Sequence, residues 1–171
     1  SDLPGSFGIP MMVDGMLTVL EDHGTMSLEE VMQPAIDLAR YGFPVTESLA
    51  ANIANNYSKI MRPTARAEAL EVYTTDGITQ VKEGDLLINK NLANTLEKIA
   101  REGREGFYKG DIARAIVSAV SKDGSVATMD DFEAAMGRTR GFQAQIPVTG
   151  TYKDVYEIIS MYPPSSGGTT L

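Results

Sequence analysis

Apolar residues recur at intervals of three and four along most of the chain, which is the pattern of amphipathic helices. The clearest stretch is residues 25–43, whose apolar positions share one helical face: Leu28, Val31, Met32, Ala35, Ile36 and Ala39. Ser27 and Glu30 have the spacing of a capping box at its start. Gly42 and Pro44 can end it, because glycine adopts the left-handed closing conformation and proline cannot continue a helix. We expect this helix to be buried scaffold.

Pro34 interrupts the same pattern. A proline inside a helix removes a backbone donor and clashes with the preceding turn, at a cost of roughly 3 kcal/mol. We therefore expect either a kink at Pro34 or two short helices, the second beginning at this residue.

Residues 11–22 form the first predicted helix, which Gly24 closes. Its apolar stripe is Met12, Met16, Val19 and Leu20. Methionine is flexible and fills irregular gaps in protein cores. We expect this stripe to pack in the core rather than to form a ligand surface.

The pattern predicts further helices at residues 47–61, 64–72, 89–103, 111–121 and 129–136. Gly103 should end the third of these, because glycine is a helix-stop signal. The segment 106–110 should be a tight linker whose two aromatic residues join neighbouring helices. Asp111 and Thr128 are the expected caps of the last two helices, and residues 73–88 should form a loop with one or two short strands.

The period changes to two after Gly141, which indicates β-strands. Residues 142–149 and 155–161 should pair as a hairpin around a turn at Lys153 and Asp154, and residues 163–168, PPSSGG, should form another turn. The sequence therefore predicts a mainly α-helical fragment with a C-terminal β-hairpin. We expect one segment, 1–171, with a helical lobe at about 11–137 and the hairpin and PPSSGG turn at about 141–168.

Composition narrows the possible functions. The formal net charge is −8, which argues against binding to nucleic acid and to anionic membranes. The absence of cysteine excludes disulfides and thiolate metal sites, and a single histidine cannot form a histidine cluster. We expect no metal and no cofactor. The first residue is Ser1 rather than methionine, and we expect a piece of a longer polypeptide.

Few residues are candidates for catalysis. The glycines of PPSSGG could direct backbone amides at an anion, and Ser165 or Ser166 could be a nucleophile. However, a serine nucleophile needs a base, and His23 is far away in the sequence, so a structural turn is the preferred interpretation. A threonine nucleophile needs its own free α-amine, which excludes Thr74–Thr75 in mid-chain and Thr169–Thr170.

Acidic pairs lie in the first or last turns of the predicted helices: Glu21–Asp22, Glu29–Glu30 and Asp130–Asp131. Carboxylates are favoured at helix starts by the helix dipole. We interpret these pairs as solvated caps, not as acid/base pairs. No acidic cluster has the spacing of metal ligands.

An ordered series of motifs from about Gly5 to Gly168 resembles the γ-glutamyltransferases (γ-glutamyltranspeptidases). Its most specific parts are QPAIDLARYGF, NLANTLEKIA followed by GFYKGDIA, and PPSSGG. The resemblance implies an N-terminal nucleophile hydrolase with an αββα fold, whose precursor cuts itself into a large and a small subunit. It implies that a threonine at the new N-terminus transfers or hydrolyses γ-glutamyl groups, such as that of glutathione.

By this resemblance the chain is the central, helical part of the large subunit, and the threonine segment is not in it. We carry over no catalytic, cofactor-binding or metal-binding residue, and expect the isolated segment to be inactive. The expected partners are the remainder of the large subunit, the small subunit and, in the intact enzyme, a γ-glutamyl substrate. Family members are often secreted, periplasmic or surface-anchored, and nothing in this sequence assigns the compartment.

Three alternatives remain open. A related γ-polyglutamate depolymerase and a related acylase would have the same scaffold. A non-enzymatic helical interaction module, derived from such an enzyme, would instead use the methionine-rich first helix as a partner surface. We also expect an isolated fragment to self-associate through the hairpin edge or through apolar patches.

Overall fold

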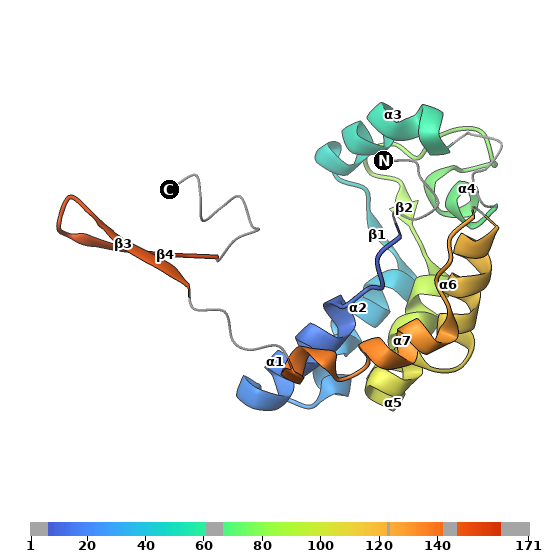
Figure 1. Ribbon diagram of the computed structural model, residues 1–171. Helices are drawn as coiled ribbons and strands as arrows, with labels where there is room; N and C mark the ends of the chain where they lie inside the picture. The colour runs from blue at the N-terminus through green and yellow to red at the C-terminus, as the bar shows by residue number, and fades with distance from the viewer. Residues whose placement is uncertain (1–6, 61–66, 123, 142–146, 162–171) are drawn as a thin grey trace. The chain divides into compact units, whose positions relative to one another are not determined.

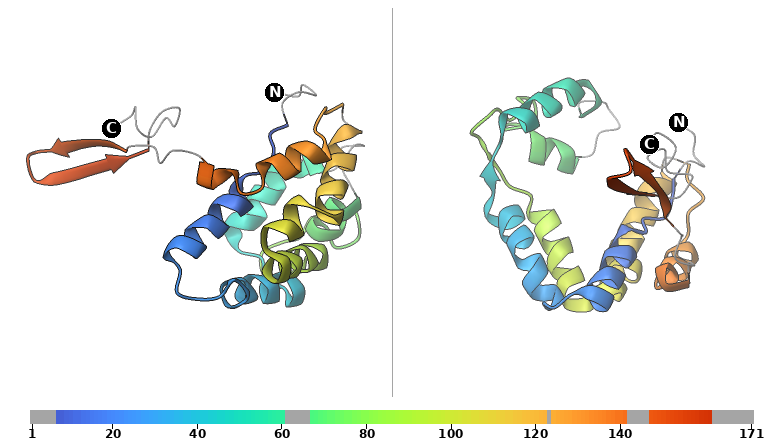
Figure 2. Two further views of the ribbon diagram at one scale, coloured as in Figure 1. Left: turned by 60° about the horizontal axis from the view of Figure 1, so that its bottom comes forward. Right: turned by 90° about the vertical axis from the view of Figure 1, so that its left-hand side faces the viewer.

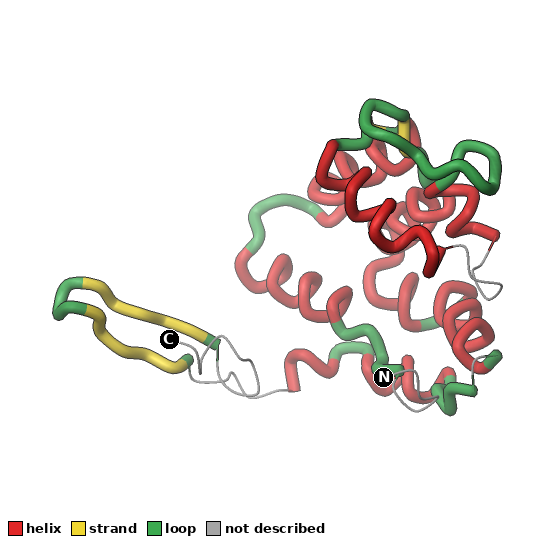
Figure 3. The backbone as a smooth tube through the Cα atoms, turned by 90° about the horizontal axis from the view of Figure 1, so that it is seen from above, coloured by secondary structure: helices red, strands yellow, loops and turns green. Residues whose placement is uncertain are grey.

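The computed structural model describes residues 7–60, 67–122, 124–141 and 147–161. In chain order its elements are α1 (Met12–His23), α2 (Leu28–Tyr41), β1 (Phe43–Pro44), α3 (Glu47–Ile60), α4 (Ala67–Tyr73), β2 (Leu86–Leu87), α5 (Lys90–Tyr108), α6 (Asp111–Ser121), α7 (Met129–Ala135), a 3-10 turn (Arg138–Gly141), β3 (Val148–Tyr152) and β4 (Tyr156–Ser160). The predicted class is confirmed, since the described chain is mainly helical and ends in a two-stranded antiparallel hairpin (Figures 1 and 3).

The chain forms two compact units, Ser1–Thr139 and Arg140–Leu171. The first contains the helices and the short β1–β2 ladder, and the second contains the hairpin. Within the described ranges, no helix is both long and apolar enough to cross a membrane.

Helix α2 begins at the predicted capping box. The Glu30 amide donates to the Ser27 hydroxyl at 3.3 Å, and the Ser27 amide donates to the Glu30 carboxylate at 2.9 Å. The prediction of two short helices is wrong, because one helix runs through Pro34 to Tyr41. Both Pro34 and Glu30 face solvent, so water can reach the Glu30 carbonyl that loses its usual donor.

Helices α2 and α5 lie side by side (Figure 2). The Asn89 amide donates to the Ala39 carbonyl at 2.9 Å. The Arg40 guanidinium reaches Asn94 at 3.3 Å and the Glu97 carboxylate at 2.5 Å. Helix α1 packs against α5 of this pair.

The prediction that helix α5 ends at Gly103 is wrong, because the helix continues to Tyr108. Gly103 has φ 59° and ψ −139°, a conformation that glycine adopts without a Cβ penalty, and so it joins two helical segments across a kink. The predicted linker is therefore partly helical, and Tyr108 is buried in the core.

The predicted Asp111 cap is also wrong: Gly110, with φ 79°, occupies the N-cap position, and the Asp111 carboxylate pairs with Lys98.

Among the described residues, two apolar clusters form part of the core of the first unit. One contains Val45, Ile53, Val81 and Leu87, held together where β1 pairs with β2. The other contains Tyr108, Ala113, Phe132 and Ala135. In this cluster Tyr108 of α5 packs with Ala113 of α6 and Phe132 of α7, and Phe107 packs against them, so the aromatic pair joins neighbouring helices as predicted.

The hairpin pairs Val148 with Ser160 and Tyr152 with Tyr156. Both residues of the predicted turn, Lys153 and Asp154, have positive φ values, at 55° and 53°. Residues 142–146 of the predicted strand, and the whole PPSSGG turn, lie outside the described residues.

Candidate functional site

Helix α1 is oriented opposite to the prediction from its apolar stripe. Met12, Met16 and Val19 are 78%, 65% and 55% exposed, so the prediction that they pack in the core is wrong. The buried residues of α1 are Asp14, Leu17 and Thr18. Asp14 follows Met12 by two residues and therefore lies about 200° around the helix from it. The polar face points inward and the methionine face points outward.

The Asp14 carboxylate is fully buried and accepts hydrogen bonds from three residues. Arg104 Nε donates to Oδ1 at 2.5 Å, and the backbone amides of Gly137 and Thr139 donate to the two oxygens at 2.9 and 2.8 Å. The Arg104 guanidinium also donates to the Thr18 hydroxyl at 2.8 Å and pairs with Glu21. These contacts join α1, α5 and the segment after α7.

Tyr108 completes this polar cluster. Its hydroxyl accepts from the Asp14 amide at 3.0 Å and donates to the Pro10 carbonyl at 2.7 Å. Among the described residues, no buried side-chain nitrogen or oxygen lacks a hydrogen-bond partner. The cluster is therefore fully satisfied, which is the condition under which a buried charge pair is tolerated.

The surroundings of Asp14 favour its charged form. Burial by itself would raise the pKa, but hydrogen bonds from Thr139, Arg104 and Gly137 outweigh it and lower the pKa of Asp14 from 3.8 to about 2. The hydrogen bond to Glu21 raises the pKa of Arg104, and burial raises the pKa of the Tyr108 hydroxyl. The shifts of Asp14 and Arg104 favour the ion pair, and the shift of Tyr108 keeps its hydroxyl protonated.

This shift predicts an acid-sensitive contribution to stability. Because the folded pKa of Asp14 is lowered, its stabilisation is complete above the unfolded value and is lost as the pH falls from about 4 through 2. The loss is of the order of 2 kcal/mol. Urea unfolding of the wild type and of Asp14→Asn should show a free-energy difference that shrinks over this pH range. A difference independent of pH would contradict the assignment.

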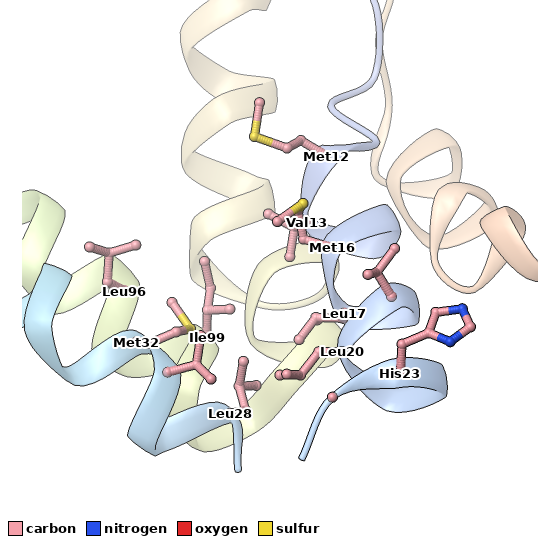
Figure 4. Close-up of a pocket in the computed structure, with 13 residues that line it drawn as sticks. Met12, Val13, Met16, Leu17, Leu20, His23, Leu28, Met32, Leu96 and Ile99 are labelled. Atoms are coloured by element: carbon pink, nitrogen blue, oxygen red, sulfur yellow. The ribbon is translucent and has the colours of Figure 1, made fainter. Parts of the chain in front are cut away.

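An apolar groove of about 490 Å³ lies between α1, α2 and α5. Figure 4 shows side chains of the three helices directed into it. Its lining consists of Met12, Val13, Met16, Leu17, Val19, Leu20, His23, Gly24, Leu28, Val31, Met32, Leu96 and Ile99. Histidine is the single titratable residue of the lining, so the groove can hold apolar groups but has no set of polar groups to orient a reacting molecule.

The residues considered for catalysis have structural environments. His23 is exposed at the end of α1, and its side chain forms no hydrogen bond or ion pair with a described residue. The Thr74 hydroxyl donates to the Leu70 carbonyl at 2.5 Å and accepts from the Gly77 amide at 2.9 Å, which fixes a turn. Ser165 and Ser166 are outside the described residues.

Two of the acidic pairs act as predicted. Glu30 and Asp131 complete capping boxes with Ser27 and Thr128, and hydrogen bonds from these caps lower the pKa of each carboxyl. In the parts of the chain that the structure describes, no group of three or more histidine or acidic residues could hold a metal ion. The Asp14–Arg104 pair was missed, because the two residues are 90 positions apart and no local pattern links them.

Comparison with known proteins gives consistent matches over almost the whole chain. The family profile described as Gamma-glutamyltranspeptidase matches residues 3–171. The chain is 39% identical to the glutathione hydrolase proenzyme of Escherichia coli over 163 residues, which are 94% of this chain and 26% of that protein. It therefore spans about a quarter of the length of this curated relative.

Solved structures agree. The crystal structure of Helicobacter pylori gamma-glutamyltranspeptidase matches with a TM-score of 0.85 and 32% identity, over 99% of this chain and 46% of that chain. The transpeptidase enzyme CapD of Bacillus anthracis matches with a TM-score of 0.77 and 31% identity, over 94% of this chain and 51% of that chain.

Proposed function

The chain belongs to the gamma-glutamyltranspeptidase family, and we propose that it is the helical large-subunit segment of a γ-glutamyltransferase or glutathione hydrolase. The observation that carries this proposal is the family match to residues 3–171, together with a TM-score of 0.85 to a gamma-glutamyltranspeptidase. In this proposal the intact enzyme transfers or hydrolyses γ-glutamyl groups through the N-terminal threonine of its small subunit.

The segment supplies scaffold and not reacting groups. Its buried charge cluster is fully hydrogen-bonded, and its described histidine has no partner. In the whole enzyme, the segment would belong to the αββα sandwich of N-terminal nucleophile hydrolases, with the helical lobe at about 11–137 and the hairpin and PPSSGG turn at about 141–168. Its partners would be the remainder of the large subunit and the small subunit.

The intact mass of the product of the uninterrupted reading frame tests this proposal. Two chains, the second beginning at threonine, together with release of product from a chromogenic γ-glutamyl substrate, are the expected result. One uncut chain without this activity would overturn it and favour the non-enzymatic interaction module.

The inactivity of the segment has its own test. The purified 171-residue chain should not turn over the chromogenic γ-glutamyl substrate. Turnover that is lost in Ser165→Ala or Ser166→Ala would show that the segment itself is catalytic.

A second candidate is a related enzyme with a different acyl substrate, such as a depolymerase or an acylase. The chain is also 33% identical, over 94% of its length, to the Acylase ACY 1 proenzyme of a Pseudomonas strain, which supports the acylase. Comparing the rates of the whole enzyme on glutathione and on poly-γ-glutamate distinguishes the two candidates, because the preferred substrate identifies the enzyme class.

The isolated segment is expected to self-associate. The strands β3 and β4 pair with each other and leave two outer edges in the described hairpin, where Val155, Tyr156 and Ile159 are 76%, 62% and 64% exposed. Unpaired strand edges and exposed apolar side chains promote association. Sedimentation velocity should show a mass that rises with concentration, and Ile159→Lys should reduce it. A monomer at every concentration would contradict this prediction.

A further inference from the structure

Donors from three residues converge on the Asp14 carboxylate. Arg104 Nε donates to Oδ1 at 2.5 Å, and the Gly137 amide donates to the same oxygen at 2.9 Å. The Thr139 amide donates to Oδ2 at 2.8 Å, and the Thr139 side chain adds a further hydrogen bond. A guanidinium and backbone amides directed at one point are the chemistry of an anion-binding site. We call Arg104, Gly137 and Thr139 the carboxylate cradle.

Arg104 is held in the cradle by contacts that do not involve the Asp14 side chain. Its guanidinium pairs with Glu21 and donates to the Thr18 hydroxyl at 2.8 Å. It also donates at 3.4 Å to the backbone carbonyl of Asp14, which stays in place when the side chain is removed. We therefore expect the guanidinium to keep its position in a variant that lacks the Asp14 carboxylate.

The two amides of the cradle are also held independently of Asp14. They follow α7, whose Phe132 and Ala135 are buried in one cluster with Tyr108 of α5. Gly137 is exposed and Thr139 is half-buried, so the cradle lies next to the surface, where a small ion can reach it. The donors thus form a site that the packing of the helices arranges in advance.

We propose that the cradle is a binding site for small carboxylates, which Asp14 fills as an internal ligand. Asp14 excludes carboxylates from solution, because a ligand attached to the chain has a high effective concentration. The side chain that fills the site gives its size. Asp14→Gly removes a methylene and a carboxylate, which together match one acetate ion, and Asp14→Ala removes the carboxylate alone, which matches one formate ion. This inference does not rest on the proposed function, and enzyme activity has no part in its test.

Chemical rescue of these two variants tests the proposal. Urea unfolding of the 171-residue chain is followed by circular dichroism at neutral pH, in sodium formate, sodium acetate or sodium chloride of equal ionic strength. The unfolding equilibrium constant of Asp14→Ala should fall roughly tenfold when formate exceeds its Kd about tenfold, because a ligand of the native state stabilises it by mass action. Acetate should stabilise Asp14→Gly more than Asp14→Ala, whose Cβ occupies the space that the acetate methyl group needs.

The wild type and Asp14→Asn are the matched controls, because a side chain of the same size fills the cradle in both. Neither should respond to formate or acetate more than to chloride. In the Asp14→Ala background, Arg104→Met removes the guanidinium and should abolish the effect of formate. This double variant distinguishes binding in the cradle from a general effect of salt on stability.

If Asp14→Ala is already unfolded in chloride, recovery of its helical circular dichroism signal in formate supports the proposal. Two results would overturn it. The first is that formate and acetate stabilise Asp14→Ala and Asp14→Gly no more than chloride does. The second is that the wild type or Asp14→Asn responds as strongly as Asp14→Ala, since the effect would then not require a vacated cradle.

Discussion

Replacing Asp14 by alanine should lower the free energy of unfolding by about 3–5 kcal/mol. The carboxylate is fully buried, and its removal leaves the Arg104 guanidinium without its buried partner. It also leaves the amides of Gly137 and Thr139 without their acceptor, which adds a smaller loss because Gly137 is exposed and Thr139 is half-buried. Urea unfolding followed by circular dichroism measures the change.

Asp111→Ala is the matched control, because Asp111 also pairs with a basic residue, Lys98, but its side chain is 67% exposed. Solvent screens such a pair, so this variant should lose only a small fraction of the stability that Asp14→Ala loses. Equal losses in the two variants would show that the buried cluster has no special role. Arg104→Ala should cost much less in the Asp14→Ala background than in the wild type, since the two residues share one interaction.

Replacing Phe132 by alanine should lower the free energy of unfolding by about 3–5 kcal/mol, because a buried ring is lost and a cavity remains. Phe132 is 0% exposed and lies in the cluster of Tyr108, Ala113 and Ala135, with its ring centroid 6.5 Å from that of Tyr108. In a chain of this size the melting temperature should fall by roughly 10 °C. Differential scanning calorimetry measures it.

Val126→Ala is the control for this prediction, since Val126 is 82% exposed and its truncation should change stability by less than about 0.5 kcal/mol. A Phe132→Ala variant as stable as Val126→Ala would mean that α7 does not pack on α5 and α6 in solution. The polar cluster depends on the same packing, because Gly137 and Thr139 follow α7 directly.

The local signals in the sequence predicted most of the secondary structure. Ser27 with Glu30 and Thr128 with Asp131 are spaced for capping boxes, and both boxes form. The alternating pattern and the turn at Lys153 and Asp154 indicated the hairpin, and its strands pair around these residues. Caps and hairpin turns are decided within a few residues, so a linear pattern contains the necessary information.

The errors arose where a distant partner decides the outcome. A glycine such as Gly103 usually ends a helix, yet α5 continues past it. The burial of Tyr108 in the core stabilises the helical segment that follows. Asp111 was expected to cap α6, but Gly110 takes the cap position and Asp111 pairs with Lys98 of α5 instead. In each case, a contact in three dimensions overrides a local preference.

The sequence alone determined the helical class, the hairpin, the exclusion of disulfide and thiolate chemistry, and the family resemblance, because each depends on residue types and their spacing. Only the tertiary structure decided which face of α1 is buried. The periodicity of the apolar residues predicted that the methionine stripe is buried, because apolar side chains are usually found in the core. Arg104, 90 residues from Asp14, offers a partner that makes burial of the polar face favourable, and the methionines then face outward. No local pattern records such a pair, and so the groove could not be predicted from the sequence.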